Sequence, residues 1–319
     1  MRTTSLALAL AVALWLLVPT LSSCAESNPP PKVAEESPTS PPPPQVSTAT
    51  ARVSELTRIT NDPADETAPR PSPDGKSLLF VAQDPDGDSG ATIVRMELGS
   101  PIRTLASEYG AYCPAWFPDG RKIAYVKIRG GAQRLVRSPV TGASAGVTFL
   151  TSSRRGEDDW QPDVSPDGKR IAFCTHIQGV WQIAAIDADG SNFTLYCPGM
   201  TPRWSPDGQR LVFDREVGLY RQIFVIDLAK AGQVSQLTTD TGVYRDPAWS
   251  PDGLWVVFEK GLTGSDLCIM KNDGSNVTQL TSGAAYDVDP SWSSDGFIYF
   301  ASKTDSDYNI WRLKPILPE

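Results

Sequence analysis

The sequence predicts an all-β fold built from six copies of one unit, and three observations indicate it. A turn tetrad of the form Ser-Pro-Asp-Gly recurs six times between residues 72 and 296, at intervals of 40 to 48 residues. Four short runs rich in Val, Ile, Leu, Thr and aromatic residues surround each tetrad, as is typical of strands. One more run of the fourth kind, residues 54–57, precedes the first tetrad. Four-stranded antiparallel units repeated six times are typical of a six-bladed β-propeller.

Each tetrad is predicted to be a β-turn between the first and second strands of its unit. In Ser72-Pro73-Asp74-Gly75, proline sets φ at the second position, aspartate accepts bonds from nearby backbone N–H groups, and glycine takes a left-handed conformation. The copies lie at residues 117–120, 165–168, 205–208, 250–253 and 293–296.

The fifth unit illustrates the four strands. Residues 246–250 precede its tetrad, 254–258 follow it, and 266–270 and 276–281 come next. The third and fourth strands are joined by Asn272-Asp273-Gly274-Ser275, in which Asp-Gly is a strong hairpin signal.

The order of strands also predicts how the ring closes. The last unit ends after its third strand, residues 309–313, and therefore lacks a fourth. We expect the N-terminal strand, residues 54–57, to pair with residues 309–313 and complete the last blade, which removes two exposed sheet edges.

The full repeat reads Pro-x-Trp-Ser-Pro-Asp-Gly and resembles the TolB-like family of propeller repeats over residues 52–313. Its Trp position is filled by Trp116, Trp204, Trp249 and Trp292, which we expect to pack one blade on the next. The resemblance implies a propeller and a bacterial envelope compartment. TolB itself carries an α/β domain ahead of its propeller, whereas here a Pro-rich segment leads into the first blade.

The first 23 residues are predicted to be a lipoprotein signal peptide. Arg2 precedes an apolar run of thirteen residues, 6–18, which is shorter than the roughly 20 residues that span a bilayer. Leu21-Ser22-Ser23-Cys24 resembles the bacterial lipobox, which implies lipid attachment at Cys24 and contact with the membrane through that anchor alone. Ala25, which is not acidic, favours the periplasmic side of the outer membrane. The alternative is an ordinary cleavage site that contains cysteine.

Residues 24–50 are predicted to be the lipidated cysteine followed by a Pro-rich tether. Pro29-Pro30-Pro31 and the four prolines at 41–44 favour an extended polyproline II conformation that buries no core. The propeller is expected over residues 51–319.

Charge and histidine content exclude several classes of function. The formal net charge is −8, which disfavours binding to nucleic acid through phosphate. The chain has one histidine, His176, so metal sites built from several imidazoles are excluded, including those of the pectin-fragment lyases that resemble TolB-like propellers. We expect no metal and no cofactor.

Motifs for catalysis are weak, and we expect the protein not to be an enzyme. The sequence Gly142-Ala143-Ser144-Ala145-Gly146 matches a nucleophile elbow, but it lies in a turn between two strands and not between a strand and a helix. Residues 84–90, Asp-Pro-Asp-Gly-Asp-Ser-Gly, space their carboxylates like the start of a calcium loop. We interpret them as a solvated hairpin tip, with a weak calcium site as the alternative.

Four cysteines other than Cys24 belong to the propeller, namely Cys113, Cys174, Cys197 and Cys268. Because Cys174 and Cys268 lie in apolar strands, we expect buried thiols and at most one disulfide. The favoured pair is Cys174 with Cys197.

The remaining candidate site is one mouth of the channel. Two sets of loops are expected to meet there, namely those that enter each first strand and those between second and third strands. Recurring Tyr, Trp and Arg on one rim suit protein recognition, because they offer large rigid contact areas with polar tips. The predicted binding residues are Asp65, Glu66, Tyr109, Tyr112, Asp159, Trp160, Tyr244, Arg245, Tyr286 and Asp289.

We therefore expect a non-catalytic envelope lipoprotein whose propeller mouth binds another envelope protein. The alternatives are a propeller that binds glycan or peptidoglycan fragments, and a hydrolase or lyase of propeller type. A purely structural role is a further alternative.

Overall fold

The structure is a computed structural model that describes residues 53–83, 90–107, 109–141, 146–152, 158–262, 264–283, 285–303 and 307–318. All described residues belong to one compact unit, residues 43–319. The signal peptide, Cys24 and the tether predicted above lie outside the described residues. No helix within the described ranges is long and apolar enough to cross a bilayer.

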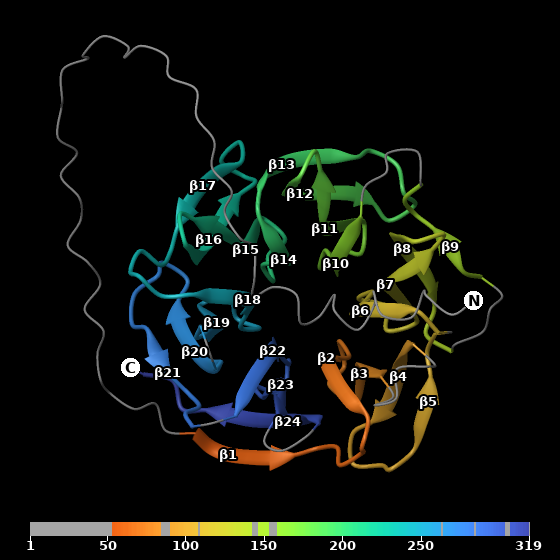
Figure 1. Cartoon of the computed structure of the whole chain (residues 1–319), viewed down its shortest axis with the longest axis horizontal. Coiled ribbons are helices and arrows are strands. Elements are labelled where there is room, and N and C mark those ends of the chain that lie inside the picture. The colour runs from red at the N-terminus through yellow and green to blue at the C-terminus, as the bar shows by residue number, and fades with distance from the viewer. Residues whose placement is uncertain are drawn as a thin grey trace, which may run out of the picture. The chain divides into compact units, whose positions relative to one another are not determined.

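Residues 53–318 form a ring of six antiparallel sheets of four strands each, as the repeats predict (Figure 1). In each sheet, or blade, the first strand in blade order faces the centre of the ring. Blade 1 holds β2 (Asp65–Pro71), β3 (Ser77–Gln83), β4 (Ala91–Glu97) and β5 (Arg103–Leu105). Blade 2 holds β6 (Ala111–Trp116), β7 (Lys122–Arg129), β8 (Ala132–Pro139) and β9 (Thr148–Phe149). Blade 3 holds β10 (Asp159–Val164), β11 (Arg170–Ile177), β12 (Val180–Asp187) and β13 (Thr194–Pro198).

The other half of the ring repeats this arrangement. Blade 4 holds β14 (Met200–Trp204), β15 (Arg210–Val217), β16 (Tyr220–Asp227) and β17 (Gln233–Gln236). Blade 5 holds β18 (Tyr244–Trp249), β19 (Trp255–Lys260), β20 (Asp266–Lys271) and β21 (Thr278–Gln279). Blade 6 holds β22 (Tyr286–Trp292), β23 (Ile298–Lys303), β24 (Tyr308–Pro315) and, as its outermost strand, β1 (Val53–Arg58).

The predicted closure of the ring is confirmed. β1 pairs antiparallel with β24, with Leu56 opposite Leu313 and Thr57 opposite Arg312. The closure continues past β1, because the backbone N–H of Ile310 donates to the Thr60 hydroxyl at 2.8 Å. The first and last segments of the propeller therefore share one blade.

The turn tetrads have the predicted geometry. At Ser72 the carbonyl accepts from the Gly75 N–H at 2.9 Å, and the hydroxyl donates to Asp74 at 2.6 Å. Gly75 has a φ of 67°, in the left-handed region that the turn requires of it.

Six apolar cores fill the spaces between neighbouring blades, one at each boundary. The repeated tryptophans pack in these cores, as predicted, and two of them also link blades through hydrogen bonds. The Nε1–H of Trp116 donates to the carbonyl of Arg70 at 2.9 Å, and that of Trp249 to the carbonyl of Arg203 at 3.1 Å.

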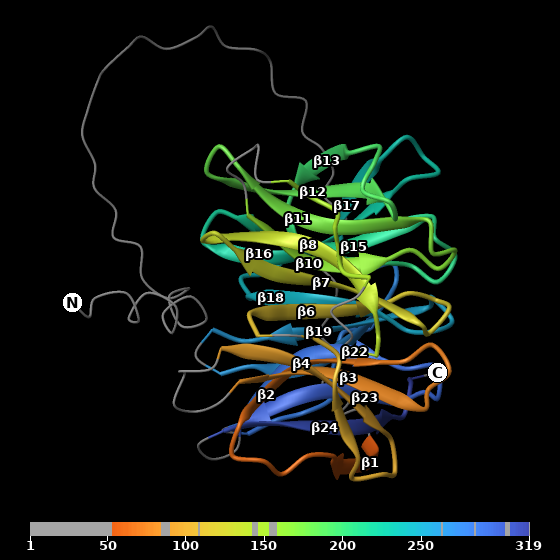
Figure 2. The ribbon, with the colours of Figure 1, turned by 90° about the vertical axis from the view of Figure 1, so that its right-hand side faces the viewer.

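Strand direction gives the ring two different faces, which Figure 2 shows from the side. We call the face with the loops that enter each innermost strand, and with the hairpins between second and third strands, the loop face. The opposite face carries the six tetrads, and we call it the turn face. The innermost strands β2, β6, β10, β14, β18 and β22 surround the centre of the ring, which we call the channel (Figure 1).

Candidate functional site

Every innermost strand carries a bulge at a residue that precedes proline. In β2 the pairing with β3 shifts between Thr67 and Arg70, and Ala68 between them has a φ of 51°. The equivalent residues of the other blades have φ values of 47° to 56°, a left-handed conformation that L-residues rarely adopt. They are Cys113, Gln161, Thr201, Asp246 and Asp289.

Side chains at these bulges meet across the channel. The amide of Gln161 in blade 3 donates to Asp246 in blade 5 at 3.2 Å, although these blades are not neighbours. The bulges therefore determine which side chains point into the channel.

Three carboxylates gather beside this ring of bulges. Oxygens of Asp246, Glu259 and Asp289 lie within 4.8 Å of one another, an arrangement that suits a hard cation such as Ca²⁺. Burial, with Asp246 and Asp289 beside it, raises the pKa of Glu259 well above its usual value. Burial and Asp246 likewise raise the pKa of Asp289. The sequence prediction named Asp289 for the channel mouth, but it named neither Asp246 nor Glu259 and did not expect the three to gather.

The same carboxylates satisfy backbone groups of the bulges. Glu259 accepts from the N–H of Asp289 at 2.7 Å, and Asp289 accepts from the N–H of Ala68 at 3.1 Å. Each bond joins neighbouring blades. It also gives an acceptor to a backbone N–H that the bulge has taken out of the hydrogen bonding between strands. The cluster thus has a structural role that requires no ion.

A buried ion pair performs the equivalent task in blade 4. Asp214 pairs with Arg221, accepts from the hydroxyl of Thr201, and accepts from the N–H of Asp246 at 3.4 Å. Burial raises the pKa of Asp214 to about 6, and Arg221 opposes that rise. Asp214 and Glu259 both follow a buried phenylalanine of the second strand, Phe213 or Phe258, so their shared position is the signal that would have found them.

Three predicted mouth residues lie in the interior, which corrects their expected role. Glu66 is 0% exposed and pairs with Arg103 at 2.6 Å, and the Tyr244 hydroxyl donates to Asp240 at 2.6 Å. Asp159 is also buried. All three stand two residues before a bulge, where the side chain enters the blade and not the channel.

Four predicted residues are partly buried near the channel or its rim. Tyr112 and Trp160 pack on each other with ring centroids 5.8 Å apart, and both extend into blade cores. Asp65 accepts from the N–H of Tyr308 at 2.8 Å, and Arg245 donates to the carbonyl of Gly261 at 3.2 Å. Asp289, the remaining half-buried residue of the prediction, belongs to the carboxylate cluster.

The exposed members of the prediction are Tyr109 and Tyr286, at 63% and 44%. Sequence reasoning missed the apolar residues that stand beside them on the loop face. These lie on the hairpins between second and third strands. They are Val180, Val217, Leu219, Tyr220 and Leu262. The three most exposed, Val180, Leu219 and Leu262, each directly follow a glycine.

All four propeller cysteines are free thiols, and Cys174 and Cys268 are buried as expected. The predicted Cys174–Cys197 disulfide is wrong. Ile183 of the strand between them is the register partner of both cysteines. Two strand spacings of about 4.8 Å separate the α-carbons by more than a disulfide can span.

The weak catalytic and calcium motifs fall largely outside the described residues, which omit 84–89 and 142–145. His176 is described, and its ring packs on Trp181 with centroids 5.0 Å apart.

Comparison with known proteins identifies the family. A sequence profile described as the TolB beta propeller domain matches residues 43–195 and 195–314, which is most of the chain. The chain belongs to the TolB β-propeller family. The resemblance that the repeats indicate is confirmed.

Sequence relatives of this TolB-type propeller are distant. An uncharacterized protein of Agrobacterium fabrum is 31% identical over 161 residues, covering 45% of this chain and 53% of its own length. An uncharacterized peptidase of Bacillus subtilis, YuxL, is 27% identical over 211 residues, covering 63% of this chain and 30% of its own. The chain thus spans about half and under a third of the lengths of these relatives.

Solved structures share the fold. TolB from Acinetobacter baumannii superposes with a TM-score of 0.61 at 21% identity, over 76% of this chain and 64% of that one. An oligogalacturonate lyase from Vibrio parahaemolyticus superposes with a TM-score of 0.57 at 13% identity, over 87% of this chain and 99% of that one. Propellers of this architecture therefore serve different functions, and the function must be argued from the site.

Proposed function

We propose that the protein is a non-catalytic lipoprotein of the cell envelope whose loop face binds a segment of another protein. The observation that carries the proposal is the apolar character of that face. Five blades, 2 to 6, each present at least one large apolar side chain to solvent there, and Leu219 is 94% exposed. In blade 4 three of them, Val217, Leu219 and Tyr220, share one hairpin, and an exposed apolar patch of this kind is typical of interaction surfaces.

The composition of the loop face favours a protein over a sugar as the ligand. Leu219, Leu262 and Val180 are aliphatic and exposed, and they offer no flat ring on which a sugar could stack. Tyr112 and Trp160, two aromatic residues predicted for the channel mouth, pack on each other. Aliphatic and tyrosine side chains ringed by polar groups suit a protein interface.

A non-catalytic role is supported by the surroundings of His176, the one histidine of the chain. It packs on Trp181 on the β11–β12 hairpin, away from the carboxylates of the channel. Those carboxylates hold backbone N–H groups of neighbouring blades, which is a structural use of acidic side chains.

The envelope location is proposed from the signal peptide, the lipobox ending in Cys24 and the family. A lipid at Cys24 followed by the Pro-rich tether would hold the propeller near the membrane while leaving both faces accessible. Fractionation of a Cys24→Ala variant tests the anchor, since the variant should leave the membrane fraction, and its retention there would refute lipid attachment.

Site-specific photocrosslinking in the native envelope tests the binding face. Photoreactive residues at Leu219, Leu262 and Tyr286 should capture one and the same protein. The controls are Leu56 and Leu105, which are 57% and 60% exposed but lie on outermost strands. Substitution L219D should abolish capture from Leu262. Equal capture at the control positions, or saturable binding of peptidoglycan fragments that L219D leaves intact, would contradict the proposal.

A further inference from the structure

We propose that the turn-face end of the channel is a binding site for a single oxyanion group, a carboxylate or a phosphate, held between Arg70 and Arg203. These residues occupy the same position in blades 1 and 4, the residue just before the repeated Trp position, and these blades stand opposite each other in the ring (Figure 1). The site lies at the other end of the channel from the loop face and does not depend on the function proposed for that face.

The two arginines border a recess of about 220 Å³ that opens among the tetrads. We call it the turn-face recess. Besides the two arginines its walls are three indole rings, the tetrad residues and one acid. They include Asp163, Trp204, Trp249, Ser250, Ser291 and Trp292.

Two arginines and one acid line the recess, and the carboxylate of Asp289, at the bulge of β22, also acts on both arginines. Asp163 is its one acid, and that carboxylate already accepts from the N–H of Trp204 at 2.7 Å. Within the described part of the chain, no ion pair joins Arg70 or Arg203 to a carboxylate. Burial, and then the neighbouring charge of Arg203, lowers the pKa of Arg70 to about 10, consistent with two cations that face each other.

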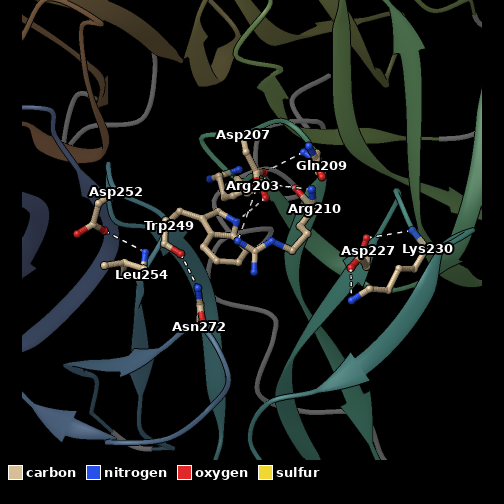
Figure 3. A network of polar contacts seen from close by, with 12 residues as sticks. Arg203, Asp207, Gln209, Arg210, Asp227, Lys230, Trp249, Asp252, Leu254 and Asn272 are labelled. Carbon is tan, nitrogen blue, oxygen red and sulfur yellow. Dashed lines mark hydrogen bonds and ion pairs between the residues drawn. The ribbon is translucent and has the colours of Figure 1, made fainter.

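Both guanidinium groups keep donors to spare. Arg203 is 8% exposed, and its Nη1 donates to the carbonyl of the adjoining Pro202 at 3.1 Å. Arg70 does the same with Pro69 at 3.0 Å. A guanidinium has five N–H groups, so each arginine can direct further bonds into the recess. Figure 3 shows Arg203 beside Trp249. The indole N–H of Trp249 donates to the backbone carbonyl of Arg203, so this bond does not involve the guanidinium group.

One indole that lines the recess differs from its counterparts in other blades. The Nε1–H of Trp204 is buried and makes no hydrogen bond to any described residue, whereas its counterparts in Trp116 and Trp249 each bond to the carbonyl of a neighbouring blade. Because this N–H is shielded from solvent, Trp204 contributes its apolar ring to the wall of the recess and not a hydrogen-bond donor.

The chemistry and size of the ligand follow from these groups. The planar guanidinium groups of Arg70 and Arg203 suit the paired oxygens of a carboxylate or a phosphate. A recess of about 220 Å³ has room for one anionic group with a few attached atoms. The indoles would pack against those atoms.

Titration calorimetry on the full-length protein tests the site, with inorganic phosphate and acetate as probes at constant ionic strength. At least one probe should bind saturably. R203Q and R70Q should each weaken that binding by about tenfold or more, because each removes hydrogen bonds to a charged group. The matched control is R210Q, since Arg210 lies 4.7 Å from the Trp249 ring but does not line the recess. It should change affinity less than about twofold.

Thermal unfolding distinguishes lost binding from lost folding. Without added anion, R203Q should unfold near the temperature of the native protein, because Arg203 forms no ion pair with a described residue and glutamine can still donate to the Pro202 carbonyl. Saturating phosphate or acetate should raise the unfolding temperature of the native protein and of R210Q, but not that of R203Q. Acetate binding alone would assign a carboxylate, and binding of phosphate an oxyanion in general. Absence of saturable binding by both probes, or unchanged affinity in R203Q, would overturn the proposal.

Discussion

The serine that opens a tetrad acts through its hydroxyl as donor and acceptor at once. Ser250 donates to Asp252 at 2.5 Å and accepts from the N–H of Trp255 at 2.9 Å. In the last tetrad the hydroxyl of Ser293 is buried and bonds to no described residue. The same residue type thus contributes differently in two copies of one turn.

Substitution S250A should lower the free energy of unfolding by about 1–3 kcal/mol, because it leaves the N–H of Trp255 without its acceptor. S293A should change it by less than about 0.5 kcal/mol, since no bond is lost. Urea unfolding of the two variants checks this difference, and equal destabilisation would show that the turn depends on something other than the hydroxyl.

The carboxylate of Glu259 makes stability depend on pH. Its raised pKa means that the folded protein favours the protonated form. The corresponding stability is fully present below the pKa of an unfolded chain, about 4.3, and is lost as the pH rises through the higher folded-state value.

Substitution E259Q should therefore raise the unfolding temperature at pH 8 by a few degrees, and by less at pH 5. The amide oxygen still accepts from the N–H of Asp289 while the repulsion from Asp246 and Asp289 disappears. E97Q, at an exposed position of β4, serves as control. A less stable E259Q at pH 8 would indicate instead that a bound cation keeps the carboxylates ionised.

At the scale of the strand, the bulge is the feature that the sequence did not predict. Tetrads, strand order and ring closure follow from local turn chemistry and apolar runs, which the chain repeats six times. Side chains along a strand point alternately to the two faces of the sheet. A bulge shifts this alternation by one residue, so it changes the face to which each following side chain points. The sequence predicts Glu66, Asp159 and Tyr244 for the mouth because they stand where loops enter the innermost strands, but all three side chains are buried. The X-Pro step in each innermost strand is the signal that locates the bulge.

Ala68 gives a test of strain at the bulge. The left-handed backbone conformation of Ala68 costs an L-residue about 1–2 kcal/mol, a cost that glycine avoids. Glycine in turn loses more backbone entropy on folding than alanine does, which lowers stability by about 0.5–1 kcal/mol. A68G should therefore leave stability unchanged or raise it by up to about 1 kcal/mol. A115G, in regular strand of β6, should lower stability by about 1 kcal/mol. Equal losses in both variants would show that the bulge stores no strain.

At the scale of the whole ring, closure depends on the pairing of β1 with β24. Without β1 the strand β24 would become an open edge, with unpaired backbone groups available to other molecules. The five other blades take all four strands from one continuous stretch of chain, so this is the boundary where the ring depends on distant segments.

Deletion of residues 53–58 should lower the unfolding temperature by about 6 °C or more, because several ladder bonds of about 1 kcal/mol each are lost. It should also cause aggregation that grows with protein concentration. The control is a deletion of equal length at residues 43–48, ahead of the first strand. Unfolding scans and size-exclusion chromatography report both effects, and identical behaviour of the two deletions would refute the importance of closure.

The pairing of β1 with β24 also places Val53 directly opposite Pro315. The two ends of the ring are thus neighbours on adjacent strands, and a short peptide linker could join them. Once they were joined, the chain could begin at any of the six tetrads, whose tips are exposed turns, without changing a single strand pair. The ring has an order of blades but no obligatory starting point, so circular permutants should reproduce both faces of the channel.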